Sequence, residues 1–368
     1  MNHQLKYNWL LLALTPNVGP VTFLKLIKHF GTPVHVFSAE REALSPFLSN
    51  KTIDALKIRM AEPAADAALK WSEGENCTLL TLQDDLYPVE LVMHTTPPPL
   101  LFLRGQHELL QKRKIAIVGS RHPTPQGIQN ATQFAYSLNE HGFVIVSGLA
   151  AGIDSAAHQG TINGNGETIA FLGTGIDRVY PSSNKKLAHT LIEKGLLVSE
   201  FPLGVKPLAQ NFPRRNRLIA ALTEATLVVE ATLESGSLIT ASLAVQMNKE
   251  VMAIPGSIHN PQSKGCHKII KEGAKLVESV EDILTELPDI YPNPNTTSNF
   301  LLSSPFDESA EDATTSVLLT TMGFHPVHPD LLAQQLQIET SLLYEQLLML
   351  ELAGKIKSTT GGRFQRLF

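Results

Sequence analysis

The sequence predicts an α/β protein in which helices cover both faces of a parallel sheet, with a small helical domain before the sheet and a compact domain after it. Between residues 114 and 287, short runs of Val, Ile, Leu and Ala alternate regularly with amphipathic segments. Continuous apolar strands separated by helices are typical of parallel sheets buried on both faces. The 368-residue chain is too long for one ordinary domain, and its pattern changes on either side of this segment.

Composition and charge set limits on the function. The chain is 43% hydrophobic and 18% charged with a formal net charge of −5, so any nucleic-acid contact must be local rather than a general basic bias. Cys77 and Cys266 fit no zinc or redox spacing, and we expect reduced packing residues in a cytoplasmic protein. The apolar patch Trp9–Leu14 is short and ends at Pro16, as a helix core face does and a signal peptide does not. No apolar run is long enough to cross a bilayer, so we expect no membrane association.

Residues 1–70 are predicted to form a small helical domain. Helices are expected around Tyr7–Leu14 and Val21–Phe30, on either side of the turn Pro16-Asn-Val-Gly-Pro20. Two helices joined by a glycine-bearing turn resemble a helix-hairpin-helix or sterile-alpha-motif-like unit. Such a hairpin can contact nucleic-acid phosphates through its N–H groups. We favour a packing role, because few cations lie nearby.

Residues 71–290 are predicted to form the sheet domain. A strand-like stretch, Leu101–Gly105, comes before the regular alternation. Strands are then expected at 114–118, 143–147, 168–172, 196–199, 225–229, 251–254 and 275–277. Helices are expected at 127–140, 153–162, 184–194, 213–222, 238–247, 265–272 and 280–287.

The loop after the first of these strands has the features of an anion site. Ligands of parallel sheets bind at the carboxyl ends of the strands, and Gly119-Ser120-Arg121 follows the strand at 114–118. Glycine lets backbone N–H groups approach an anion, and the helix that follows adds a partial positive charge. The spacing matches neither G-x-G-x-x-G nor G-x-x-x-x-G-K-[ST], so it indicates neither a dinucleotide nor a P-loop nucleotide. Phosphate binding and a structural tight turn both remain open.

A cluster of arginines opens the helix expected at 213–222. Arg214 and Arg217 lie close to one face of that helix, whereas Arg215 points elsewhere. Guanidinium groups beside a glycine-rich loop suit backbone phosphates. The alternative is a salt-bridged helix start, although cations at a helix N-terminus oppose the helix dipole. The pattern therefore favours a phosphate-bearing ligand at these arginines.

Other polar and aromatic residues near these loops have two interpretations each. Phe212 can stack on a base or anchor the packing next to Pro213. Lys185 and Lys186 either extend the groove or form a solvated helix face. Ser235-Gly236-Ser237 lacks the G-x-S-x-G pattern of a nucleophile, and we interpret it as a backbone nest for phosphate.

Asp154 and His158 stand four residues apart and are expected on one helix face. A catalytic dyad or a metal pair can have this spacing, and so can a carboxylate in the first turn with a hydrogen-bonded histidine. We favour the structural interpretation, because no third ligand lies at a fitting spacing.

The C-terminal part is predicted to be a linker at 291–314 and a domain at 315–368. The linker is rich in Pro, Ser and Asp. Helices expected at 317–322, 329–336 and 341–353, followed by a glycine-turned hairpin, form the outline of a winged helix. The helix in the recognition position, Ser341–Glu351, carries Glu345 and Glu351 but no Lys or Arg. Because major-groove binding needs cations for the phosphates, we expect this domain to serve packing or protein contact.

Many separate motifs occur in order along the central segment. They are Tyr87-Pro88, Pro98-Pro99-Leu100, Leu103-Arg-Gly105, Ile117-Val-Gly-Ser-Arg121, Ser147-Gly-Leu-Ala-x-Gly-Ile-Asp154, Ala157-His158, Gly175-Ile-Asp177, Tyr180-Pro181, Ser199-Glu200, Phe212-Pro-x-Arg-Asn-Arg217, Val229-Glu230, Ser235-Gly-Ser-Leu-Ile-Thr-Ala241, Pro255-Gly256 and Gly273-Ala274. Together these motifs resemble the DprA/Smf family, the DNA processing proteins of natural transformation. The head and tail match more loosely.

The resemblance implies an extended Rossmann fold that binds single-stranded DNA, forms a homodimer and helps to load the recombinase RecA. We expect no catalytic residues, no metal and no cofactor. Combined with the residue patterns above, it predicts a DNA-binding site made of Gly119, Ser120, Arg121, Lys185, Lys186, Phe212, Arg214, Arg215, Asn216, Arg217, Ser235, Gly236 and Ser237.

The alternative function is enzymatic. The core also resembles nucleotide phosphoribohydrolases, which carry P-G-G-x-G-T-x-x-E after the fifth strand and use its glutamate as catalytic acid or base. Here that place reads Glu234-Ser-Gly-Ser-Leu-Ile-Thr-Ala241, and the downstream glutamate is missing. Without a placed carboxylate, glycosidic cleavage has no evident proton donor. A purely structural scaffold is a third possibility and leaves the arginines unexplained.

Overall fold

The computed structural model describes residues 3–287 and, in the tail, residues 318, 322, 327–329, 332–333, 343, 347, 350–351, 356–359 and 363–366. The chain divides into two compact units, residues 1–298 and residues 299–368. The predicted linker at 291–314 lies outside the described residues.

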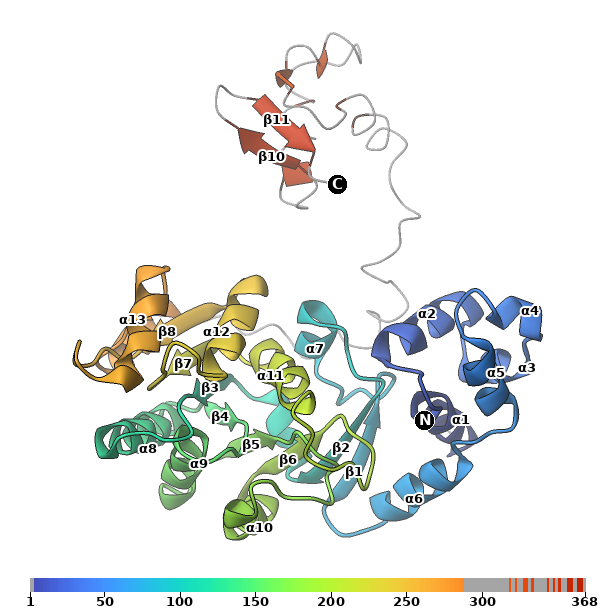
Figure 1. The fold of residues 1–368 in the computed structure, drawn as a ribbon, viewed down its shortest axis with the longest axis horizontal. Coiled ribbons are helices and arrows are strands. Elements are labelled where there is room, and N and C mark those ends of the chain that lie inside the picture. Colours follow the sequence, from blue (N-terminus) through green and yellow to red (C-terminus); the bar gives the residue numbers. More distant parts are fainter. Residues whose placement is uncertain are drawn as a thin grey trace. The chain divides into compact units, whose positions relative to one another are not determined.

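The N-terminal part of the first unit is a cluster of short helices (blue in Figure 1). They are α1 (His3–Leu14), α2 (Pro20–Phe30), α3 (Pro33–Ser38), α4 (Arg41–Leu44), α5 (Asn50–Lys57) and α6 (Glu62–Ser72). The two predicted helices form, and their faces meet through Trp9 and Phe23, whose ring centroids are 4.9 Å apart. The remaining helices were not predicted from the sequence. Trp9 shares one hydrophobic core with Leu80 and Leu101 of the sheet, so this cluster packs against the sheet domain.

The central sheet has its strands in the order β1-β2-β6-β5-β4-β3-β7-β8-β9. Their bounds are β1 (Cys77–Thr81), β2 (Leu100–Gly105), β3 (Lys114–Val118), β4 (Val144–Ser147), β5 (Thr168–Phe171), β6 (Leu196–Ser199), β7 (Ala225–Val228), β8 (Glu250–Ala253) and β9 (Lys275–Leu276). All strands predicted from residue 114 onward form, and neighbours from β6 to β9 pair in parallel.

The other edge of the sheet is antiparallel, a direction that the sequence did not predict; the strand-like stretch Leu101–Gly105 forms β2. β2 pairs antiparallel with β6, with Leu103 opposite Val198, and the unpredicted β1 pairs antiparallel with β2. Antiparallel edge strands are common on otherwise parallel sheets. Here the N-terminal helices cover this edge through the shared core, in place of a crossover helix.

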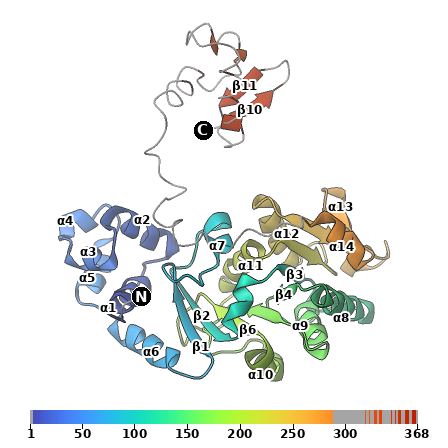
Figure 2. The same ribbon diagram turned by 180° about the vertical axis from the view of Figure 1, so that it is seen from behind.

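Helices cover both faces of the sheet, as predicted. They are α7 (Val89–His94), α8 (Pro125–Glu140), α9 (Ile153–Asn163), α10 (Lys185–Lys194), α11 (Asn211–Leu222), α12 (Ser237–Gln246), α13 (Lys264–Lys271) and α14 (Val280–Glu286), with short 3-10 helices at His107–Gln111, Ser182–Asn184 and Pro261–Ser263. Alternate residues of β3 face opposite sides. Ile115 and Ile117 share a core with α8, α9 and α14, whereas Ala116 and Val118 share the core of α11 and α12. In Figure 2 the ribbons of α8, α9 and α14 lie on the right.

The strand order reverses beside β3, and this reversal positions the site. From β3 the chain proceeds outward to β4, β5 and β6, and then returns to the opposite side of β3 with β7, β8 and β9. Connections on the two sides leave in opposite directions, so the carboxyl ends of β3 and β7 lie beside a crevice. Such a switch point is the usual ligand site of open α/β sheets.

The second unit is a small winged-helix domain. β10 (Ile356–Thr359) and β11 (Arg363–Arg366) form an antiparallel hairpin, and Val327 bridges to Phe364. The described residues inside the three predicted helices are helical. Those with buried side chains form one core together with Ile356: Leu318, Met322, Leu332, Leu343, Leu347 and Leu350. Glu345 of the predicted recognition helix lies outside the described residues, and Glu351 is helical.

Among the residues that the structure describes, no helix combines the length and the apolar character that crossing a membrane requires.

Candidate functional site

A pocket of about 700 Å³ opens at the carboxyl ends of β3 and β7, where the strand order reverses. Its walls come from the loop after β3, the loop after β4, the start of α11 and the start of α12. Nine of the predicted site residues line it: Gly119, Ser120, Arg121, Phe212, Arg215, Asn216, Ser235, Gly236 and Ser237. The fold therefore brings together segments that are more than a hundred residues apart in the sequence.

The loop that carries Arg121 is held in place by Glu230, directly after β7. The Glu230 carboxylate accepts hydrogen bonds from the Thr124 backbone N–H (2.8 Å) and hydroxyl (2.6 Å), and its carbonyl accepts one from the Ser120 N–H (2.7 Å). A Cβ on Gly127 would lie 2.4 Å from the Glu230 carboxyl carbon, so the helix can start this close only with glycine there. The loop is therefore fixed before any ligand binds.

Glu230 was not among the predicted site residues, although it belongs to the Val229-Glu230 motif. Its side chain is buried, and its role depends on a partner 106 residues away in the sequence. The sequence feature that could have identified Glu230 is a carboxylate that follows an otherwise apolar strand.

Arg121 is exposed beside two aromatic rings. Its guanidinium carbon lies 5.6 Å from the centroid of the Phe212 ring, and the Tyr180 ring is 5.6 Å from that of Phe212. Arg121 forms no ion pair with any carboxylate in the part of the chain that the structure describes. A permanent cation next to two aromatic faces suits a ligand that carries both phosphate and base.

Arg215 occupies the floor of the pocket and is 4% exposed. Its guanidinium donates hydrogen bonds to the carbonyls of Gly148 and Phe171, the latter at 2.6 Å. Burial lowers the pKa of Arg215 to about 10, and the charge of Asp154 opposes this shift. The side chain therefore remains protonated at neutral pH. It fastens α11 to the ends of β4 and β5.

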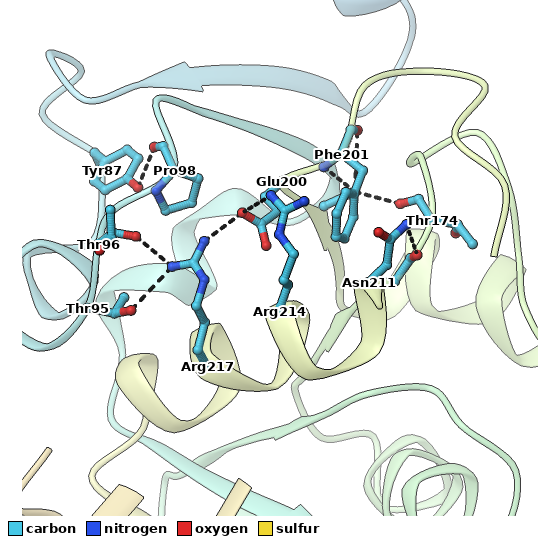
Figure 3. Close-up of polar contacts among 12 residues, drawn as sticks. Tyr87, Thr95, Thr96, Pro98, Thr174, Glu200, Phe201, Asn211, Arg214 and Arg217 are labelled. Atoms are coloured by element: carbon cyan, nitrogen blue, oxygen red, sulfur yellow. Dashed lines mark hydrogen bonds and ion pairs between the residues drawn. The ribbon is translucent and has the colours of Figure 1, made fainter. Parts of the chain in front are cut away.

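Arg214 and Arg217 lie on the other side of α11, outside the pocket, around the buried Glu200 (Figure 3). Arg217 places one nitrogen 2.6 Å from a Glu200 oxygen and donates with another to the Thr96 carbonyl at 2.6 Å. Arg214 is 3.7 Å from the same Glu200 oxygen and 5.2 Å above the Phe201 ring. The predicted shared face of Arg214 and Arg217 is thus present, and its geometry is that of the salt-bridged alternative.

Burial raises the pKa of Glu200, and the charges of Arg217 and Arg214 oppose that rise. A carboxylate in this position needs cationic partners, since an unpaired buried charge is costly.

Lys185 and Lys186 are exposed at the start of α10 and do not line this pocket. Lys185 instead lines a separate hollow that also contains Arg104.

Asp154 and His158 have the contacts of structural residues. The Asp154 carboxylate accepts from the N–H groups of Gly148 (3.1 Å) and Ala150 (3.3 Å). Thr168 donates its hydroxyl proton to a carbonyl, so His158 Nδ1, 2.7 Å from that hydroxyl oxygen, is the donor between them. Burial, and then the charge of Arg215, lowers the pKa of His158 to about 3. No group of three or more His, Cys, Asp or Glu side chains within the described ranges is arranged to hold a metal ion.

Comparison with known proteins gives the same family along three parts of the chain. Residues 78–288 match the model of the DNA recombination-mediator protein A family, residues 303–362 match the DprA winged helix domain, and residues 3–39 match the DprA-like N-terminal HHH domain. The protein Smf of Escherichia coli is 40% identical over 81% of this chain and 79% of its own length. The DNA processing protein DprA of Streptococcus pneumoniae is 46% identical over 56% of this chain and 73% of its own length.

Two solved structures are similar to this one. The X-ray structure of DprA from Streptococcus pneumoniae superimposes with a TM-score of 0.64 at 36% identity, covering 77% of this chain and 99% of that one. DprA from Helicobacter pylori, solved for its single-stranded DNA binding mode, gives a TM-score of 0.52 at 29% identity, covering 57% of this chain and 98% of that one.

Proposed function

This chain belongs to the DprA family of DNA recombination-mediator proteins, and from that premise we propose that it binds single-stranded DNA in the cytoplasm through the pocket at the carboxyl ends of β3 and β7. The observation that carries this proposal is the exposed Arg121. Its guanidinium lies over Phe212 in a pocket whose loop is already fixed, and it has no carboxylate partner among the described residues.

Each part of the pocket has a task in the proposed binding. Arg121 contacts backbone phosphate with two N–H groups, a geometry that lysine cannot reproduce. Phe212 and Tyr180 offer faces on which bases stack, and stacking is worth about 1–3 kcal/mol per base and tolerates any sequence. Ser235, Gly236 and Ser237 begin α12, where backbone N–H groups and the helix dipole favour an anion. Arg215 fastens the start of α11 to the ends of β4 and β5 beneath the pocket.

The finer parts of the proposal rest on the family resemblance alone. We propose that the protein forms a homodimer through its central domain and delivers the bound strand to a RecA-type recombinase. Nothing in the described surface identifies either contact, so both are tested by measuring association directly.

We do not propose the phosphoribohydrolase alternative. That reaction needs a placed carboxylic acid. Asp154, which lines the pocket, and Glu230, behind its loop, both accept backbone hydrogen bonds that shape the loops. Glu234 also lines the pocket, but it is exposed and lies before Ser235, whereas the phosphoribohydrolase glutamate lies downstream in the motif. Release of base from nucleoside monophosphates by the purified protein would revive this alternative.

The test measures affinity for a mixed-sequence single strand, for the same sequence as a duplex, and the dependence of both on salt. We expect tighter binding to the single strand. Arg121→Ala should weaken that binding by about 1–3 kcal/mol, the scale of a lost charge-assisted hydrogen bond, and should reduce the salt slope by about 0.7. Arg121→Lys should recover only part of the loss.

Lys51→Ala removes an exposed cation on α5 and serves as the matched control. Tighter binding to the duplex, or an Arg121→Ala variant that binds like wild type, would contradict the proposal.

A further inference from the structure

Arg104 belongs to the Leu103-Arg-Gly105 motif, and the proposed pocket does not use it. It lies on β2 with its side chain partly buried. Its Nε atom is buried and has no hydrogen-bond partner in the described part of the chain. Leaving a buried donor unpaired is unfavourable. An anion bound beside Arg104 would supply the partner that its Nε–H lacks within the described protein.

Two adjoining hollows meet at Arg104. One, of about 670 Å³, lies between α6, β1 and α10, and the other, of about 450 Å³, lies between α10 and the loop after β5. They share Arg104, Asp177 and Ile192. The larger hollow mixes Lys70 with the carboxylates of Glu75 and Glu193, and so does not favour an anion.

The smaller hollow, which we call the Arg104 hollow, is mainly cationic. Arg178, Lys185 and His189 line it together with Arg104. Among the described residues, Asp177 is the one carboxylate that lines it; Asp177 accepts a hydrogen bond from the Gly204 N–H at 2.9 Å and lies 3.9 Å from Arg178 Nε. The surplus positive charge therefore comes from residues of three separate segments.

The Arg104 hollow is the immediate neighbour of the proposed DNA pocket. Tyr180 lines the pocket, whereas Arg178, Val179 and Ser182 line the hollow. Only the short segment around Tyr180 separates the two. A strand that stacks on Tyr180 and continues past it meets the cations of the hollow next.

We infer that the Arg104 hollow is a second phosphate subsite, which takes the backbone of the same single strand after it passes Tyr180. This inference rests on the proposed function. Arg104 supplies a planar set of donors for a phosphodiester group, including the Nε–H that has no partner in the described protein. Lys185 and Arg178 flank it at the solvent side as exposed charges.

The test compares strands of two lengths. Single-strand-binding folds such as the OB fold cover about 4 to 16 nucleotides, so we choose strands of about 4 and about 16 nucleotides. Arg104→Gln should lower the affinity for the long strand about tenfold or more, the effect of a lost charge-assisted contact. The slope of log affinity against log salt for that strand should fall by about 0.7. The variant should leave the affinity for the short strand unchanged. Arg121→Ala should lower the affinity for both strands, and the control Lys51→Gln should change neither affinity.

Each other outcome has a definite meaning. If Arg104→Gln binds both strands like wild type while Arg121→Ala weakens both, the second subsite is refuted and the proposed function stands. If wild type binds neither strand, both are refuted. If Arg104→Gln does not fold, the exposed Lys185→Gln replaces it, and an unchanged long-strand affinity in that variant refutes the subsite.

Inorganic phosphate separates a strand subsite from a site for a small anion. Phosphate should compete with the long strand less strongly in Arg104→Gln than in wild type, because the variant keeps the phosphate contacts of the Arg121 pocket but loses those of the Arg104 hollow. Phosphate that binds in an Arg104-dependent way without reducing long-strand affinity would assign the hollow to a small anion and overturn the inference.

Discussion

The proposed DNA pocket at β3 and β7 and the group of Arg214, Arg217, Phe201 and Glu200, here called the Glu200 cluster, contain the same kinds of side chain in different proportions. In each, a guanidinium lies over a phenylalanine ring, Arg121 over Phe212 at 5.6 Å and Arg214 over Phe201 at 5.2 Å. The Glu200 cluster also contains a buried carboxylate, that of Glu200, which forms an ion pair with Arg217 at an N···O distance of 2.6 Å. The pocket offers Arg121 no such partner among the described residues. Whether a cation serves a ligand or the fold thus depends on the carboxylate beside it, not on the cation or the ring.

The same contrast holds along the single helix α11. Arg214 is half-exposed, Arg215 is buried under the pocket, and Arg217 is fastened to Glu200 and Thr96. Three arginines within four residues therefore have three different environments. The following changes test this contrast, beginning with the largest expected effect.

Arg215→Met should destabilise the fold by about 3–5 kcal/mol, the cost of leaving a buried charge unpaired. The change removes the cation next to Asp154 and the donors to the carbonyls of Gly148 and Phe171. Urea unfolding of the two proteins measures the difference. Arg214→Met, at the next position on the same helix, is the control and should stay within about 0.5 kcal/mol of wild type. Similar losses in both variants would mean that burial does not distinguish these arginines.

His158, which is buried near Arg215, should make the stability of the fold depend on pH. Its pKa is about 3 in the folded protein and about 6.5 in the unfolded chain. Between these values the unfolded chain binds a proton that the folded protein does not, so stability is lost as the pH falls below 6.5. The slope from this group approaches about 1.4 kcal/mol per pH unit. Unfolding of His158→Gln at several pH values should give a flatter profile than wild type, and parallel profiles would contradict the prediction.

Arg217→Gln should destabilise the protein by about 1–3 kcal/mol, because it leaves the buried Glu200 without its closest partner. Its affinity for a short single strand, measured where the variant is fully folded, should match that of wild type. Arg121→Gln should give the opposite result, with stability kept and affinity lost. If Arg217→Gln loses affinity without losing stability, the Glu200 cluster belongs to the DNA surface after all.

Deleting residues 315–368 should have the smallest effect on DNA. The predicted recognition helix of the winged-helix domain carries no Lys or Arg, so it lacks the cations that phosphate contacts need. Short-strand affinity of the truncated protein should stay within a factor of ten, or about 1.4 kcal/mol, of the full chain. A larger loss in a binding titration would identify the tail as a DNA-binding module.

The sequence by itself determined the framework of the site. Continuous apolar runs and the segments between them were enough to locate β3 to β9 and the helices that follow them. Because the carboxyl ends of parallel strands share one edge of a sheet, it also followed that Gly119–Arg121 and Ser235–Ser237 lie together. Elements outside this alternation escaped prediction. β1 (Cys77–Thr81) comes before the alternation begins, and α4 has four residues, about one helical turn, which is too few for a helical period to be recognised.

Only the tertiary structure decided which arginine is available to a ligand. Arg217 is paired by Glu200, seventeen residues away, Arg215 lies under the ends of β4 and β5, and Arg121 is left without a carboxylate among the described residues. Sequence spacing gives the face of a helix on which a side chain lies, but not what the fold packs against that face. The partners come from distant segments, and a charge that is satisfied within the protein is distinguished from a free one only when those segments are in place.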